Sequence, residues 1–344
     1  MINELNNIKL KKLMKNYYIL NKTPLRVSLF GGGTDFKDFF EKKQGSTISF
    51  TINQFIYTTL KKHYGKIFNE NVRLNYSRVE RLNNFGSIKN DIIRETLNYF
   101  NYQNPIYLST VSDIPAGTGL GSSSSFIVGL VKSLSTFKKK LNKHQIAILA
   151  SKIEIEKLKS PIGVQDHFIA SYGGFKKINY YKNNIQVIPL TKYEKDLKKI
   201  LNHSLFIWLK KTRSANKILS YQKQNIEKNF ANLKYLYELQ ECFYKELKSN
   251  ISLKIFGELL KESWITKKKI SKKISNKKIE EIVNILESNN CLGYKVLGAG
   301  GGGFLMAVFE NDDKKRFIKK YEKKFNFLEF NYYPKGTENI VENI

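Results

Sequence analysis

The chain has 344 residues, of which 41% are hydrophobic, so it is long enough for two domains that each bury a core. It contains no run of about 18 apolar residues, so we expect no membrane-spanning helix. Residues 1–16 lack the apolar stretch of a secretory signal, and Cys242 and Cys291 have no neighbouring His or Cys. These features predict a cytoplasmic protein without a structural metal site.

The formal net charge of +29 is large enough to suggest a nucleic-acid partner. The excess is mainly lysine, spread along the chain and accompanied by many Asn and Ile residues, which is also what an AT-rich coding bias produces. No zinc-finger, RNP or helix-turn-helix pattern accompanies the charge. We therefore expect no nucleic-acid and no membrane partner, and an anionic small substrate would account for part of the charge.

The first predicted element is a strand over residues 22–30, in which the side-chain character alternates. It runs into Gly31-Gly32-Gly33-Thr34-Asp35, a turn that needs backbone freedom. A helix over residues 36–42 follows, with Asp35 as its N-terminal acid. The next predicted elements are two strands and a helix, over residues 45–59, 72–76 and 91–100.

The most distinctive stretch is residues 113–125, DIPAGTGLGSSSS, which lies between a predicted strand (105–111) and an apolar helix (126–137). Three glycines at alternate positions allow a tight turn and a close approach to a ligand. The serines begin the helix, where unpaired N–H groups and the helix dipole favour an anion. This order predicts a phosphate-binding loop. A solvated linker is the alternative, although flexible linkers rarely join a strand to an apolar helix.

A second helix is predicted over residues 145–158, with apolar residues near helical spacing. It carries Glu154 and Glu156 and must end before Pro161. Residues 163–167, GVQDH, follow. Taken alone these acids are weak evidence for a site, since most helical glutamates are solvated.

The C-terminal half is predicted to begin with a hairpin (173–188), a lysine-rich connector (193–201) and a buried strand (205–209). A long amphipathic helix (226–247) and two further helices (279–286 and 314–324) follow. We place a domain boundary near residue 190. The charge cluster over residues 267–278 is the best local candidate for binding a polyanion, with a solvated helix face as the alternative.

Residues 294–304, YKVLGAGGGGF, formally satisfy the Gly-x-Gly-x-x-Gly pattern of dinucleotide-binding loops. That pattern requires a helix after the glycines and an acid about 20 residues later. Here the apolar run of residues 304–309 predicts a strand. The segment therefore does not favour a dinucleotide site, and no Gly-Lys-Ser/Thr occurs that would indicate a Walker A loop.

Together these segments resemble the motifs of the GHMP small-molecule kinases, such as galactokinase, homoserine kinase and mevalonate kinase. Residues 115–123 fit the family pattern Pro-x-x-x-Gly-Leu-Gly-Ser-Ser, and residues 24–35 are similar to the first motif of its sugar branch. Residues 154–166 resemble the Glu…Pro-x-Gly-x-x-Asp pattern of galactokinase-like members, and residues 294–304 resemble the third motif. The resemblance covers nearly the whole chain.

This resemblance implies an α+β fold in two domains, with ATP and substrate in the cleft between them. Residues 1–190 would form the N-terminal domain, ribosomal-protein-S5-domain-2-like, which holds the ATP phosphate loop and the catalytic aspartate. Residues 191–344 would form a ferredoxin-like C-terminal domain that holds the third glycine motif.

The resemblance also assigns roles to residues. Ser123 and Glu154 would hold Mg²⁺, a hard cation that prefers oxygen ligands, with Glu156 as the alternative to Glu154. Asp166 would orient or deprotonate the acceptor hydroxyl, and Arg26 would keep Asp166 ionised and neutralise developing charge. The residues assigned to ATP are Pro115, Ala116, Gly117, Thr118, Gly119, Leu120, Gly121, Ser122, Ser123 and Ser124. Those assigned to the substrate are Gly32, Gly33, Thr34, Asp35, Arg213, Gly300 and Gly301.

Arg213 is assigned as a contact to a substrate phosphate, and a surface salt bridge is the alternative. Within the family, residues 31–35 and 163–166 look most similar to the D-glycero-D-manno-heptose 7-phosphate kinases, which phosphorylate the anomeric hydroxyl in the synthesis of nucleotide-activated heptose for surface polysaccharide. His167 departs from that pattern, because glutamine commonly follows the aspartate. Fucokinase or galactokinase activity is the alternative among enzymes, and a catalytically silent sensor with the same fold is the alternative to an enzyme. We expect a small sugar phosphate as ligand and a monomer or homodimer.

Overall fold

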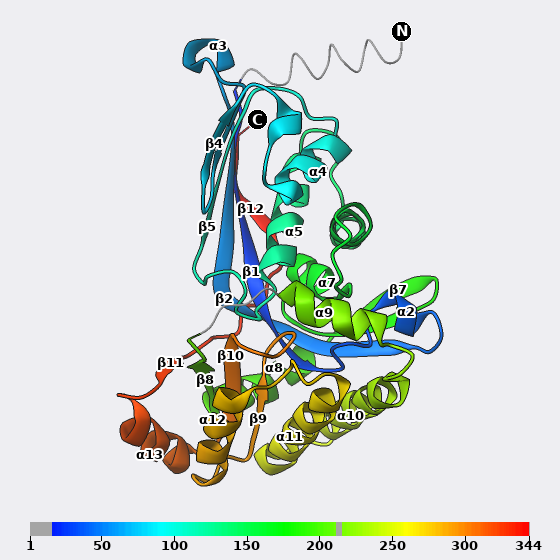
Figure 1. The fold of residues 1–344 in the computed structure, drawn as a ribbon, viewed down its shortest axis with the longest axis vertical. Coiled ribbons are helices and arrows are strands. Elements are labelled where there is room, and N and C mark those ends of the chain that lie inside the picture. The colour runs from blue at the N-terminus through cyan, green and yellow to red at the C-terminus, as the bar shows by residue number, and fades with distance from the viewer. Residues whose placement is uncertain (1–15, 211–214, 344) are drawn as a thin grey trace.

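The computed structural model describes residues 16–210 and 215–343, and these residues form two sheets with helices packed against them (Figure 1). The larger sheet has the strand order β12-β1-β2-β5-β3-β4, with β6 paired to β2 and β7 to β6. Its strands are β1 (Tyr18–Phe30), β2 (Gly45–Lys62), β3 (Val72–Asn75), β4 (Val79–Leu82), β5 (Ile106–Ser112), β6 (Phe175–Tyr181), β7 (Asn184–Pro189) and β12 (Glu338–Asn343).

Helices α4, α5 and α7 lie on one side of this sheet (Figure 1). Helix α5 packs on β1 and β2 because its apolar residues, among them Ile127, Leu130 and Val131, form a fully buried stripe. The helices of this part are α2 (Lys37–Phe40), α3 (Gly65–Phe68), α4 (Asp91–Tyr99), α5 (Ser122–Ser135), α6 (Lys143–Ser151), a π-helical segment (Lys152–Lys157) and α7 (Gln165–Tyr172).

The smaller sheet is antiparallel, with the strand order β11-β8-β10-β9. Its strands are β8 (Ser204–Trp208), β9 (Gly293–Val296), β10 (Phe304–Val308) and β11 (Asn326–Leu328). The helices of this part are α8 (Glu194–Asn202), α9 (Ala215–Gln224), α10 (Phe230–Lys248), α11 (Leu253–Ile270), α12 (Lys277–Glu287) and α13 (Asn311–Tyr321). Helix α11 packs along β9, with Trp264 fully buried.

Helices α9 and α11 of this half were not predicted, and two predicted segments differ from the structure. Residues 193–201 were expected to form a connector, but α8 occupies them, because Leu197, Ile200 and Leu201 form a buried stripe among the lysines. The long helix predicted from residue 226 begins at Phe230.

One of the hydrophobic cores is shared by the two parts. Phe30 of β1 stacks on Phe243 of α10, with their ring centroids 4.5 Å apart, and Phe256 of α11 lies against the same ring. Strand β12 pairs with β1, so the end of the described chain returns to the larger sheet (Figure 1). The division of the chain at residues 190 and 191 stays a prediction.

Strand β1 is irregular next to Arg26, a residue of the candidate active site described below. Its pairing with β2 shifts register between Pro24 and Arg26, which suits proline because it has no N–H to give to a ladder. The backbone N–H of Arg26 donates instead to the carbonyl of Leu120, at 3.0 Å. This hydrogen bond ties the predicted phosphate loop to the strand that carries Arg26.

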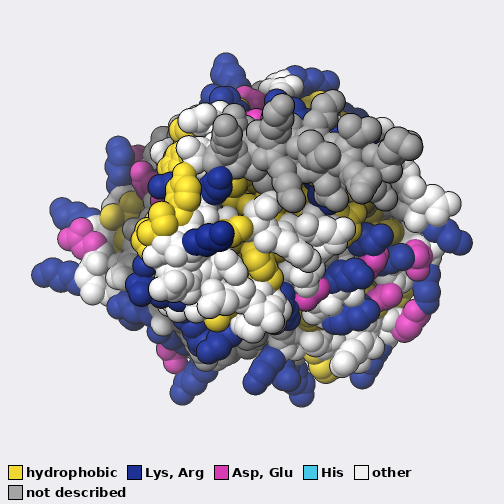
Figure 2. Space-filling model, turned by 90° about the horizontal axis from the view of Figure 1, so that it is seen from above, with side chains coloured by type: hydrophobic (Ala, Val, Ile, Leu, Met, Phe, Trp, Pro, Cys, Tyr) yellow, Lys and Arg dark blue, Asp and Glu magenta, His cyan; other side chains and the backbone are white. Residues whose placement is uncertain are grey.

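Positive charge is spread over the one face of the molecule that Figure 2 shows. Figure 2, which views the end of the molecule that carries α3, shows Lys and Arg side chains distributed around this face instead of gathered in one patch. No helix of the described residues has the length and apolar character needed to cross a membrane.

Candidate active site

Arg26 connects the phosphate loop to the predicted catalytic acid. Its Nε donates to Oδ1 of Asp166 at 2.7 Å and its Nη2 to Oδ2 at 2.5 Å, so the ion pair is bidentate. Its Nη1 donates to the carbonyl oxygen of Gly119 at 2.6 Å. The structure therefore brings together residues that are 140 positions apart in the sequence.

Asp166 lies in the first turn of α7 and its side chain is 22% exposed. Burial opposes its ionisation, but the charge of Arg26, the hydrogen bonds from Arg26 and a hydrogen bond from Gln165 outweigh burial and hold the pKa of Asp166 below its usual value. Ser28 donates to Oε1 of Gln165 at 2.9 Å, which fixes the amide beside the acid. Asp166 is thus an ionised hydrogen-bond acceptor with a fixed orientation.

A second carboxylate, Glu154, lies beside the start of α5. It is 2% exposed and accepts hydrogen bonds from Ser123 at 2.5 Å and Ser124 at 3.0 Å. Glu156 is exposed, so the structure brings Glu154, and not Glu156, to the serines. The fully buried His167 places its Nε2 at 2.7 Å from Glu154. His167, the departure from the family pattern, therefore contacts Glu154 and not the substrate pocket.

The loop of residues 115–124 has the conformation that its glycines suggest. Gly119 has φ +84°, and a Cβ there would lie 2.5 Å from the carbonyl oxygen of Leu297 in the third glycine motif. Helix α5 begins at Ser122 after Gly121, without a side-chain cap, so its first N–H groups are left for a ligand. The predicted phosphate loop and third motif are therefore packed together.

Asp35 is buried against Gly163. Its Oδ1 accepts from the N–H of Gly33 at 2.9 Å and its Oδ2 from the N–H of Gln165 at 3.2 Å. A Cβ at Gly163 would lie 2.0 Å from Oδ2, so only glycine fits there. Burial is the main cause that raises the pKa of Asp35, and the charge of Asp166 adds to it. The two hydrogen bonds act in the opposite direction but do not outweigh burial. The prediction that Asp35 is the N-terminal acid of a helix over residues 36–42 is wrong, because α2 begins at Lys37 and Phe36 is its N-cap.

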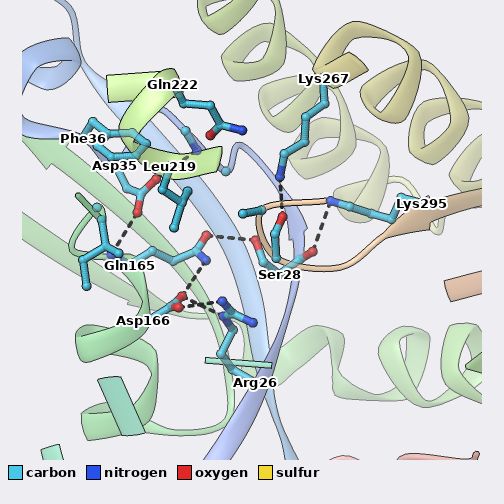
Figure 3. Close-up of a pocket in the computed structure, with 16 residues that line it drawn as sticks. Arg26, Ser28, Asp35, Phe36, Gln165, Asp166, Leu219, Gln222, Lys267 and Lys295 are labelled. Atoms are coloured by element: carbon cyan, nitrogen blue, oxygen red, sulfur yellow. Dashed lines mark hydrogen bonds and ion pairs between the residues drawn. The ribbon is translucent and has the colours of Figure 1, made fainter. Parts of the chain in front are cut away.

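Arg26, Asp35 and Asp166 open onto one pocket with an empty volume of about 570 Å³, including space open to solvent (Figure 3). Its lining comes from both parts of the molecule: Arg26, Ser28, Gly32, Gly33, Asp35, Phe36, Ile162, Gly163, Gln165, Asp166, Leu219, Gln222, Lys267, Lys295, Gly298 and Ala299. The polar members that sequence reasoning missed are Ser28, Gln165, Gln222, Lys267 and Lys295. Only their position in space distinguishes these lysines from the many others.

Some predicted substrate residues lie elsewhere. Thr34 is fully buried, and its hydroxyl donates to the carbonyls of Gly31 and Ser46, so it fixes the turn onto β2. Gly300 and Gly301 pack against Ile274 outside the pocket lining. Arg213 lies outside the described residues. Substrate contacts of these four residues stay predictions.

Comparison with known proteins connects this geometry to a family. The GHMP kinases N terminal domain matches residues 88–174 and the GHMP kinases C terminal domain matches residues 240–326. The D-glycero-alpha-D-manno-heptose 7-phosphate kinase of Campylobacter jejuni subsp. jejuni is 30% identical over 340 residues, which cover 93% of this chain and 98% of that relative. The chain belongs to the GHMP kinase family. This GHMP kinase is therefore a phosphotransferase, and ATP is the phosphoryl donor of its family.

Two further proteins are similar to this chain at lower identity. The mevalonate kinase of Methanocaldococcus jannaschii is 28% identical over 74% of this GHMP kinase and 80% of that relative. The crystal structure of a D-glycero-D-manno-heptose 1-phosphate kinase from Bacteroides thetaiotaomicron has a TM-score of 0.73 at 21% identity, covering 93% of this chain and 98% of that chain. The predicted family and the predicted α+β fold class are confirmed.

Proposed function

We propose that this GHMP kinase transfers the γ-phosphoryl group of ATP to the anomeric C1 hydroxyl of D-glycero-D-manno-heptose 7-phosphate, forming the 1,7-bisphosphate. We further propose that the product serves the synthesis of nucleotide-activated heptose for surface polysaccharide. The observation that carries the proposal is the bidentate clamp of Arg26 on Asp166, which also holds Gly119 of the phosphate loop. The name of the Campylobacter jejuni relative supports the choice of sugar.

In the proposed reaction Asp166 accepts a hydrogen bond from the attacking hydroxyl and directs its oxygen at the γ-phosphorus. A bond forms between that oxygen and phosphorus, the bond from phosphorus to the β–γ bridging oxygen breaks, and ADP leaves with the bonding pair. The hydroxyl proton passes to Asp166 and then to solvent. Because its pKa is low, Asp166 is a weak base, and catalysis rests mainly on position and charge.

Arg26 and the N–H groups at the start of α5 supply positive charge where the transferred group develops negative charge. The proposed ATP-binding residues are those of the loop from Pro115 to Ser124. Gly32, Gly33 and Asp35 line the pocket beside Asp166 and are the proposed contacts to the sugar hydroxyls. The Asp35 carboxylate accepts backbone hydrogen bonds from Gly33 and Gln165, and a carboxylate has about four lone-pair sites, which leaves room for such hydroxyls.

Mg²⁺ is the proposed metal, and Ser123 and Glu154 would hold it. The donor set fits, because a hydroxyl and a carboxylate are oxygen ligands and both lie where the loop would meet phosphates. In the described part of the chain no three His, Cys, Asp or Glu residues gather to form a cage, and Mg²⁺ commonly takes most of its ligands from phosphates and water. When bound, the ion would neutralise charge on the nucleotide phosphates.

The test is a panel of sugars and sugar phosphates incubated with Mg-ATP, with ADP release as the rate and ³¹P NMR for the position of the new phosphate. We expect heptose 7-phosphate to give the highest kcat/KM and the product to carry an anomeric phosphate. A clear preference for galactose or fucose would favour the alternative within the family. Phosphorylation at a hydroxyl other than C1 would refute the proposal.

A further inference from the structure

The pocket is electrostatically asymmetric. Asp166 and its partner Arg26 lie at one side of it, whereas Gln222, Lys267 and Lys295 lie toward the other (Figure 3). These three side chains come from α9, α11 and β9, which are distant in the sequence. All three can donate hydrogen bonds through nitrogen, as an anion requires.

Lys295 is the most unusual of the three. It is 5% exposed, and its Nζ donates to the carbonyls of Leu29 at 2.6 Å and Ser28 at 3.2 Å. Within the described residues it forms no ion pair, although a buried ammonium is costly without a counter-charge. Burial, followed by the charges of Lys267 and Arg26, lowers its pKa well below the usual value. An anion beside Lys295 would reverse that shift and supply the counter-charge.

Gln222 gives an independent indication. It is 6% exposed and lines the pocket, yet its amide Nε2 has no hydrogen-bond partner among the described residues. Buried donors are nearly always satisfied, so an unsatisfied one at a pocket wall points to a ligand acceptor. Lys267, in the last turn of α11, is half-buried, and its Nζ donates to the carbonyl of Gly298 at 2.6 Å, which holds the ammonium at the pocket edge.

We propose that Gln222, Lys267 and Lys295 form a subsite that binds the phosphate already present on the sugar substrate, at the side of the pocket away from Asp166. The reacting hydroxyl then faces Asp166, and the phosphate fixes the direction in which the sugar lies. The inference rests on the proposed function in that the substrate carries a phosphate.

The test compares D-glycero-D-manno-heptose 7-phosphate with the same heptose without phosphate, under Mg-ATP. In Lys267→Ala we expect kcat/KM for the phosphorylated sugar to fall about 10- to 100-fold, the loss typical of one charge-assisted hydrogen bond. The value for the unphosphorylated sugar and KM for ATP should change by less than about threefold, because neither contact involves this lysine. Gln222→Ala should lower the ratio of kcat/KM for the phosphorylated sugar to kcat/KM for the unphosphorylated sugar by a smaller factor than Lys267→Ala. Lys295→Met tests the buried ammonium, with thermal unfolding to verify that the variant folds.

Lys269→Ala is the matched control, because Lys269 lies in the same helix turn as Lys267 but is exposed and outside the pocket. Lys269→Ala should keep the wild-type ratio of kcat/KM for the phosphorylated sugar to kcat/KM for the unphosphorylated sugar. If Lys267→Ala keeps that ratio, or raises KM for ATP instead, the subsite is refuted while the proposed function stands. If Arg213→Ala alone abolishes the preference, Arg213 binds the phosphate and the subsite is likewise refuted.

The wild-type enzyme separates the two proposals. If it prefers a different phosphorylated sugar, the proposed substrate is wrong, and the same comparison with that sugar and its unphosphorylated form still tests the subsite. If it shows no preference for any phosphorylated sugar, both the proposed function and the subsite are refuted.

Discussion

The ion pair of Arg26 and Asp166 allows a quantitative prediction about stability. Both side chains are largely removed from solvent, at 6% and 22% exposed. Removing one partner leaves the other buried without a counter-charge, which costs about 3–5 kcal/mol in buried pairs. Because Asp166 keeps some contact with water, we expect the lower end of that range, about 3 kcal/mol, for Arg26→Met at pH 7.

The double variant Arg26→Met/Asp166→Asn removes both charges, so no uncompensated ion remains. We therefore expect it to be destabilised by about 2 kcal/mol less than the sum of the two single variants. Arg26→Lys, which keeps the charge but loses the bidentate geometry, should fall between the wild type and Arg26→Met.

The difference in the free energy of unfolding between wild type and Arg26→Met should also depend on pH. The folded-state pKa of Asp166 is depressed, so the pair stabilises the fold fully above the unfolded pKa of about 3.9, and this contribution is lost as pH falls through the folded pKa. In Arg26→Met the buried carboxyl has a raised pKa instead, and acidification from pH 7 relieves its penalty. The difference in the free energy of unfolding between the two proteins should therefore become smaller as pH is lowered.

Urea titrations of the wild type, Arg26→Met, Asp166→Asn, the double variant and Arg26→Lys at pH 7 and pH 5, without nucleotide, measure these free energies of unfolding. Additive losses in the double variant, or a gap that widens on acidification, would refute the interpretation of Arg26 as the counter-ion that keeps Asp166 charged.

Three further predictions concern the neighbouring groups. Gly163→Ala places a Cβ 2.0 Å from Oδ2 of Asp35, so the chain must move by about 1 Å. We expect kcat/KM in the ADP-release assay to fall about 100-fold, and a normal rate would count against this packing. Glu154→Gln should raise the Mg²⁺ concentration needed for half-maximal rate by at least about 10-fold, whereas the exposed Glu156→Gln should not, and the opposite order would make Glu156 the ligand. His167→Ala removes one of the partners of Glu154 and should raise the same Mg²⁺ requirement by a smaller factor. Binding of Mn²⁺-ATP, measured by electron paramagnetic resonance, is a readout separate from turnover.

The phosphate loop and the catalytic pair could be predicted because their signals are local. Alternating glycines and a serine-initiated helix specify a loop within 13 residues, and the structure gives Gly119 the positive φ that this loop requires. The family pattern then placed Arg26 and Asp166, which the fold brings into contact. No periodicity in the chain would have paired two residues so far apart.

Other features were beyond local reasoning. The choice between Glu154 and Glu156 depends on the π-helical segment of residues 152–157, which shifts the register that a period of 3.6 assumes. Asp35 follows a turn and resembles an N-terminal acid, but tertiary contacts with Gln165 and Gly163 determine its position. Lys295 resembles every other lysine until the fold buries it.

Asp166→Asn tests the central claim most directly. The variant keeps the size of the side chain and removes the charge that accepts the hydroxyl hydrogen bond. We predict that turnover of heptose 7-phosphate falls at least about 1,000-fold while the Kd for Mg-ATP, measured by calorimetry, stays within about threefold of the wild-type value. Turnover near the wild-type rate would contradict the assignment of Asp166 and the mechanism built on it.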